Sequence, residues 1–123
     1  MKPDYAKPYN NIGVVYFAKK DYPVAIQNYK KAISIDPKNI DALNNLSVAY
    51  KKLGQLEMAK SVLNQALKMN ANHAGTHYNL VVLYEETGNL ESAIHFYKKF
   101  WRLGMANHPL LVQKVEKHIQ TLK

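Results

Sequence analysis

The sequence predicts an all-α solenoid, a stack of helical hairpins in which each hairpin buries its apolar face against its neighbours. Within each hairpin, apolar residues follow the three-and-four spacing of amphipathic helices. Alanine, tyrosine and isoleucine or leucine each recur at an interval of 34 residues: Ala25, Ala59 and Ala93; Tyr16, Tyr50 and Tyr84; Ile12, Leu46 and Leu80. A fixed period of this length is typical of repeat proteins, which favours a binding scaffold over an enzyme.

The length and charge of the chain limit what it can be. Its 123 residues correspond to a single domain, residues 1–123, with three repeats at about 6–39, 40–73 and 74–107. Seventeen Lys and Arg against nine Asp and Glu give a net charge of +8, which favours acidic partners. Because cysteine is absent, there is no disulfide framework and no thiolate metal site.

No segment of the sequence indicates a membrane span or a secretory signal. No apolar run approaches the roughly 18 to 20 residues that cross a bilayer, and the first ten residues lack the apolar core of a signal peptide. A cytoplasmic location is therefore the default expectation.

The first hairpin departs from the other two at its turn. Lys20 stands where the later repeats have glycine, so this turn is expected to be tight or strained. Asp21 is placed to cap the second helix, and Pro23 lies in its first turn, where a missing N–H does no harm.

The second and third hairpins have clearer boundaries. Residues 40–53 and 56–69 are predicted to be the two helices of the second repeat, separated by Gly54, and Gly88 separates the helices of the third. Asn89 is expected to cap the last of these helices. The small residues Ala25, Ala59 and Ala93 let the two helices of each hairpin approach closely.

Both ends of the chain carry information. Pro3 lies 34 residues before Pro37, at the closing position of a preceding repeat. Two origins fit this register: a piece of a longer array, and a natural start that carries a proline. After the third repeat, residues 109–122 are expected to form a helix that caps the stack, with Phe100 and Trp101 packing against it. Its apolar stripe comprises Leu111, Val115, Ile119 and Leu122.

The pattern as a whole resembles the tetratricopeptide repeat (TPR) family over roughly residues 6–107. The first repeat carries the aromatic, small and proline positions of that family: Tyr9, Ile12, Gly13, Tyr16, Ala25, Tyr29, Ala32 and Pro37. The second has Ser47 for the glycine and Ala71 for the proline, and the third has Phe100 where alanine is expected. The resemblance implies a right-handed superhelical solenoid that binds proteins or peptides without catalysis, as a module of a larger protein.

In that family the first helices of the repeats line a concave groove. The resemblance places Asn11, Asn45 and Asn79 at one position of this groove, a ladder similar to that of O-linked N-acetylglucosamine transferases. Side-chain amides can donate to and accept from the backbone of an extended peptide. The residues expected to bind peptide are Asn10, Asn11, Val14, Phe17, Asn44, Asn45, Val48, Lys51, Lys52, Tyr78, Asn79 and Val82. This ladder is expected to serve recognition without stabilising the fold.

One subtype of the family does not fit. Members that bind chaperone tails clamp a terminal carboxylate with Lys and Asn from the first repeat, Asn from the second, and Lys and Arg from the third. The corresponding positions are Asn10, Val14, Asn45, Gly75 and Asn79, of which only Asn45 matches. A carboxylate clamp is therefore not expected.

Two alternative functions remain. The first is polyanion or RNA binding by cations of the second helices and the tail, although the interleaved aromatic residues that stack on bases are missing. These cations are Lys30, Lys31, Lys60, Lys68, Lys98, Lys99, Arg102, Lys114 and Lys117. The second is self-association through the first hairpin, which makes a homo-oligomer through the N-terminal end a further expectation.

The sequence gives little support to catalysis or to a bound cofactor. His73 and His77 have a spacing that could hold a metal ion, but no third ligand accompanies them. Glu85 and Glu86 are adjacent and therefore point in different directions on a helix. No phosphate-binding loop or nucleophile motif is present. We expect no enzyme activity, no metal and no cofactor.

Overall fold

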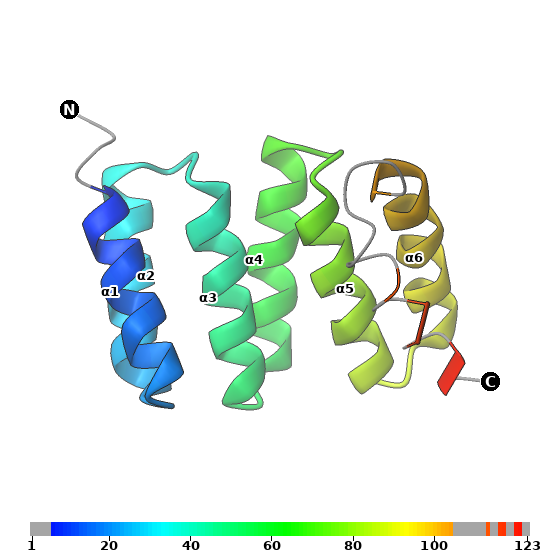
Figure 1. The fold of residues 1–123 in the computed structure, drawn as a ribbon, viewed down its shortest axis with the longest axis horizontal. Helices are drawn as coiled ribbons and strands as arrows, with labels where there is room; N and C mark the ends of the chain where they lie inside the picture. Colours follow the sequence, from blue (N-terminus) through cyan, green and yellow to red (C-terminus); the bar gives the residue numbers. More distant parts are fainter. Residues whose placement is uncertain (1–5, 105–112, 114–115, 118–119, 122–123) are drawn as a thin grey trace. The chain divides into compact units, whose positions relative to one another are not determined.

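The computed structural model describes residues 6–104, 113, 116–117 and 120–121. These residues form α-helices and no strand. The helices are α1 (Ala6–Ala18), α2 (Tyr22–Ile35), α3 (Ile40–Lys52), α4 (Leu56–Met69), α5 (Ala74–Glu86) and α6 (Leu90–Gly104). Consecutive helices pair into three hairpins (Figure 1). The chain divides into two compact units, Met1–Met69 with the first two hairpins and Asn70–Lys123 with the third. The all-α prediction is confirmed.

The helices begin and end close to the predicted residues. Helix α4 has the predicted bounds, and α3 ends one residue early because Leu53 is its C-cap. The predicted caps are also present: the Asp21 carboxylate accepts from the N–H of Val24 at 3.4 Å, and the Asn89 side chain accepts from that of Ser92 at 3.1 Å. Polar residues with the ability to cap therefore fix these helix starts.

The turns within the hairpins require a left-handed residue, and only two of the three have glycine. Gly54 and Gly88 have φ of 77° and 78°, whereas Lys20 adopts φ of 64° at the same repeat position. Glycine takes this conformation at little cost, but a side chain with a Cβ does not. The strain expected in the first turn is confirmed.

Each hairpin closes over small residues. Ala25, Ala59 and Ala93 are all buried, as predicted. In the first hairpin, Gly13 of α1 lies against the ring of Tyr29 of α2, and an ideal Cβ on Gly13 would lie 2.5 Å from Cε1 of that ring. This closeness explains why the first repeat has glycine opposite a tyrosine.

In the first unit, the two hairpins join through α2 and α3. Ala32 of α2 and Ala42 of α3 are buried in one cluster, with Ile33 packed against it. Tyr50 of α3 is buried, and the ammonium of Lys30 lies 5.8 Å from the centre of its ring. Side chains from both helices thus make a continuous core across this joint.

The third hairpin has a different core. Phe100 of α6 occupies the repeat position of Ala32, and it is buried against Val81 of α5. Partly buried aromatic residues, including Trp101, pack against this pair. Phe100 therefore forms part of the core of its own hairpin. Its expected packing against a capping helix lies outside the described residues and stays a prediction.

The predicted capping helix, about 109–122, falls mostly outside the described residues, as does Pro3. Gln113, Glu116, Lys117, Gln120 and Thr121 are described and helical. Within the described ranges, no helix combines the length and the apolar character needed to cross a membrane.

Candidate functional site

The first unit brings amides from two repeats into contact. The side-chain Nδ2 of Asn45 on α3 donates to Oδ1 of Asn10 on α1 at 3.0 Å. Both side chains are half-buried. Asn45 was expected to belong to a ladder that serves recognition without stabilising the fold, but this hydrogen bond also ties the two hairpins together.

The other two asparagines of this unit differ from one another. Asn11 is exposed on α1. Asn44 is nearly buried, and its Nδ2 donates to the carbonyl of Ile40 in its own helix at 3.0 Å. Asn11 is therefore the more accessible amide, while Asn44 is already bonded to backbone.

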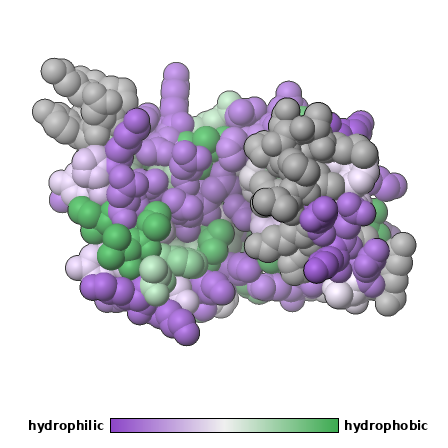
Figure 2. Space-filling model, in the orientation of Figure 1, coloured by the Kyte–Doolittle hydropathy of each residue, from purple (hydrophilic) through white to green (hydrophobic). Residues whose placement is uncertain are grey.

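Apolar side chains lie beside these amides. Val14 is exposed on α1, and Val48 is half-buried at the equivalent position of α3. Phe17 packs edge-on against Tyr22, with ring centres 5.2 Å apart. Figure 2 shows exposed apolar residues of the first unit gathered over α1. The surface thus combines polar amides with apolar side chains.

Lysines mark the far end of α3. Lys51 and Lys52 lie in its last turn, where positive charge complements the helix dipole. Lys52 is exposed and Lys51 is half-buried.

The third hairpin carries the remaining predicted residues within the second unit. Tyr78, Asn79 and Val82 are all half-buried on α5. The ring of Tyr78 lies 6.0 Å from that of Phe100, which anchors it to the hairpin core. That these residues extend the surface of the first unit into one groove stays a prediction.

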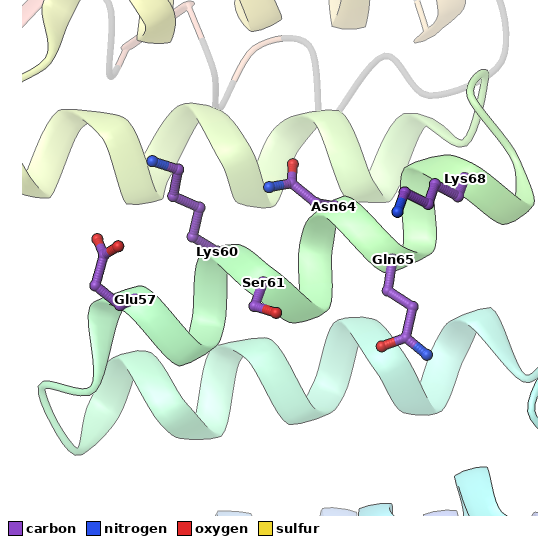
Figure 3. A pocket seen from close by; sticks show the side chains of 6 residues that line it. All are labelled: Glu57, Lys60, Ser61, Asn64, Gln65 and Lys68. Atoms are coloured by element: carbon purple, nitrogen blue, oxygen red, sulfur yellow. The ribbon is translucent and has the colours of Figure 1, made fainter.

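A depression that the sequence did not predict lies on α4. Its volume is about 470 Å³, and its lining is polar: Glu57, Lys60, Ser61, Asn64, Gln65 and Lys68. Figure 3 shows these side chains fanning out along the helix instead of converging on one point. This arrangement is that of a solvated helix surface and offers no shared binding point.

The two histidines with metal-like spacing hold the backbone around the start of α5. His73 is the N-cap, and its Nδ1 accepts from the N–H of Thr76 at 3.1 Å. His77 is buried, and its Nε2 donates to the carbonyl of Ala71 at 2.7 Å. Burial lowers the pKa of His77, the hydrogen bond to Ala71 partly opposes this shift, and the positive charge of Lys99 lowers the pKa further. The ring is therefore neutral at pH 7.

Family models match most of the chain. A TPR repeat model matches residues 15–54, and a tetratricopeptide repeat model matches residues 40–73 and 74–103. A curated relative, the BBSome complex member BBS4 homolog of Drosophila melanogaster, is 40% identical over 47 residues, which are 38% of this chain. The match spans only 10% of the length of that relative.

Solved structures with the same fold include three complexes. The first TPR of Spaghetti (RPAP3) bound to the HSP90 peptide SRMEEVD has a TM-score of 0.86 and 24% identity, covering 99% of this chain and 98% of that one. PcrH in complex with the chaperone binding region of PopD has a TM-score of 0.88 and 14% identity, covering 99% and 93%. The TPR2B-domain:pHsp70 complex of yeast Sti1 has a TM-score of 0.88 and 19% identity, covering 95% and 94%.

The repeat period, the helical hairpins of the described residues and the matched family models agree. This chain belongs to the tetratricopeptide repeat family.

Proposed function

We propose that this protein is a non-catalytic interaction scaffold that binds an extended peptide across the first helices of its repeats. The amides of Asn11 and Asn45 would bond to the peptide backbone, and Val14 and Val48 would contact small apolar side chains. On the third repeat, Tyr78, Asn79 and Val82 would contact peptide in the same way.

The hydrogen bond between Asn10 and Asn45 carries the proposal. Because it joins α1 to α3, amides of neighbouring repeats lie close enough for one extended strand to reach both. Each amide offers a donor and an acceptor, which matches the alternating N–H and C=O groups of a peptide backbone. Exposed Val14 beside these amides supplies apolar surface that a peptide would remove from water.

The structural relatives support the general function. The Spaghetti (RPAP3) domain binds an HSP90 peptide, PcrH binds a region of PopD, and the yeast Sti1 domain is in complex with pHsp70. These likenesses support peptide binding in general. The specific surface that we propose consists of Asn11, Val14, Asn45 and Val48.

The ligand chemistry should differ from that of a carboxylate clamp. Asn10, Val14, Gly75 and Asn79 stand where clamp-bearing members have Lys, Asn, Lys and Arg, so a terminal carboxylate lacks four of its five usual partners. Recognition should therefore depend on the peptide backbone and on small apolar residues, and a free C-terminus should matter little.

The test is selection from a displayed library of random peptides of about ten residues, the length scale of extended-peptide recognition. Peptides enriched on the wild type are then titrated against the double variant Asn11→Ala/Val14→Asp by calorimetry. We expect at least about tenfold weaker binding, since two hydrogen bonds and an apolar contact are lost.

Matched controls keep this test specific. Gln27→Ala/Met58→Asp changes two exposed residues of the second helices and should leave affinity unchanged. Amidation of the peptide C-terminus should have no effect. Equal affinity for the wild type and the Asn11/Val14 variant would refute the proposed surface, and a strict need for the free carboxylate would indicate a clamp.

A further inference from the structure

Another depression lies within the third hairpin, between the residues that precede α5 and the last turns of α6. Its volume is about 280 Å³, and it is lined by Ala71, Asn72, His77, Lys99, Arg102 and Leu103. These residues are distinct from Tyr78, Asn79 and Val82, the part of this hairpin that we propose to contact peptide. The depression is therefore a separate candidate site.

The lining of this depression is positively charged. Lys99 and Arg102 are both exposed on α6, and none of the six lining residues carries a carboxylate. Residues three apart on a helix lie on the same side, so the two charges act on the same volume. The exposed amide of Asn72, from the loop before α5, adds hydrogen-bond donors. The chemistry of the lining thus favours an anion.

A buried histidine forms another part of the wall. His77 is 2% exposed, and its Nδ1 is buried without a hydrogen-bond partner in the described part of the chain. Burial lowers the pKa of this ring, the hydrogen bond to Ala71 opposes that shift, and the positive charges of Lys99, His73 and His95 lower the pKa further. An anion beside Lys99 would offset that positive charge. His77 can therefore report whether the depression is occupied.

We propose that this depression binds a phosphate monoester, with Lys99 and Arg102 contacting the phosphate oxygens and Asn72 donating a further hydrogen bond. The guanidinium of Arg102 presents paired donors that match two phosphate oxygens, and the ammonium of Lys99 acts as a point charge. A monoester carries about −1.5 to −2 charges at pH 7, which two cations balance. A carboxylate carries a single negative charge and should bind less tightly.

The first experiment is a titration of the full chain with sodium phosphate, followed by heteronuclear NMR at constant ionic strength. We expect saturable shifts of the signals of Asn72, Lys99 and Arg102, with half-saturation on the order of 1 mM for a few charge-assisted contacts. The amide of N-acetyl-phosphoserine should bind similarly, because only its phosphate is recognised. Acetate should require at least about tenfold higher concentrations.

Two double variants separate local contact from general attraction. Lys99→Gln/Arg102→Gln should raise the dissociation constant for phosphate at least about tenfold, because both charged contacts are lost. Lys68→Gln/Lys98→Gln removes the same charge from exposed residues outside the depression and should raise it by less than about twofold, since salt screens distant charges. All four positions are exposed on helices, so circular dichroism should show unchanged helix content.

His77 supplies a readout that general charge screening does not reproduce. Sulfate is the probe for this measurement, because it has the tetrahedral shape of phosphate and keeps its charge over the pH range in which histidine titrates. Followed by NMR of the ring, the pKa of His77 should rise towards its ordinary value of 6.5 when sulfate binds. In Lys99→Gln/Arg102→Gln, sulfate should leave that pKa unchanged.

Three results would overturn the proposal. They are equal shifts with phosphate and with chloride at the same ionic strength, equal weakening by the two double variants, and a pKa of His77 that does not respond to sulfate. Poly-U tests the competing class of ligand. If it shifts the same signals more strongly than phosphate at an equal concentration of phosphate groups, the site is a polyanion surface and the assignment to a monoester is wrong.

Discussion

At the scale of single residues, the pairing of Gly13 with Tyr29 shows how side-chain size is distributed between the helices of a hairpin. The second repeat has Ser47 at the glycine position and Leu63 at the tyrosine position. The third has Val81 there, buried, and Tyr97 is displaced to a half-buried position. A larger residue on the first helix thus goes with a smaller or less buried partner on the second.

The effect of Gly13→Ala on the free energy of unfolding should change sign when the residue opposite, Tyr29, is replaced. Helix propensity favours alanine by up to about 1 kcal/mol. The new methyl would overlap the Tyr29 ring, however, and overpacking of this kind costs about 1–3 kcal/mol. We expect a net loss of about 1 kcal/mol in the wild type and a gain in the Tyr29→Leu background, measured by urea unfolding. If Gly13→Ala changed stability in the same direction in both backgrounds, the Tyr29 ring would have to move aside freely.

Exchanging the residues of two turns should isolate the cost of backbone strain. Lys20→Gly relieves a side chain from a left-handed conformation and should stabilise the protein by up to about 1 kcal/mol. Gly54→Lys is the reverse change and should destabilise by about as much, since no atom lies near its missing Cβ and only the backbone is strained. If both changes shifted the urea midpoint in the same direction, this explanation would be contradicted.

His77 should make the protein less stable as pH falls. Its pKa is lowered mainly by burial; the hydrogen bond to Ala71 opposes this and the positive charge of Lys99 adds to it, with a net lowering that favours the neutral ring in the folded state. Below the ordinary value of 6.5 the unfolded chain binds a proton that the folded chain does not. The free energy of unfolding should therefore fall from pH 6.5 downward and stay level above it. His77→Gln, which can still donate to Ala71, should flatten this dependence, and His95→Gln should preserve most of it.

At the scale of elements, α1 and α3 should differ in local stability although their sequences are in register. Two residues of α1 are buried, against seven of α3. Helices with fewer buried contacts open more readily. In dilute solution, we expect amide hydrogens of α1 to exchange at least about tenfold faster than those of α3, or about 1.4 kcal/mol less protection. Equal protection would mean that another surface covers α1.

The helices themselves were predictable from sequence, but several side-chain roles were not. The 34-residue period fixes helix starts, turns and small residues because each depends on local chemistry, as at Asp21 and Gly54. The packing of Phe100 in its own hairpin was not predicted, because it depends on Val81 of the facing helix. Asn45 was expected to serve recognition alone. Its hydrogen bond to Asn10 joins two repeats, and the sequence does not reveal such a contact. The capping role of His73 could have been inferred from Asn39, its equivalent one repeat earlier.

At the scale of the whole molecule, the net charge of +8 raises the question of nucleic-acid binding. Part of the positive charge lies over aromatic rings: the ammonium of Lys31 is 4.7 Å from the ring centre of Tyr9, and that of Lys30 is 5.8 Å from that of Tyr50. These lysines contribute cation–π contacts to the fold. The exposed cations Lys98, Lys99 and Arg102 of α6 are better placed to attract a polyanion.

Such attraction should be weak and should depend steeply on salt. Each phosphate neutralised on single-stranded RNA contributes about 0.7 to the slope of log affinity against log salt. The triple variant Lys98→Glu/Lys99→Glu/Arg102→Glu should therefore reduce that slope by about 2. Fluorescence anisotropy with labelled poly-U would measure this slope, and library-selected peptides should bind the variant as they bind the wild type. Because peptide contacts made through amides and valines release few counterions, their affinity should change little with salt. Tight poly-U binding at physiological salt that the triple variant abolishes would instead make nucleic acid the main ligand.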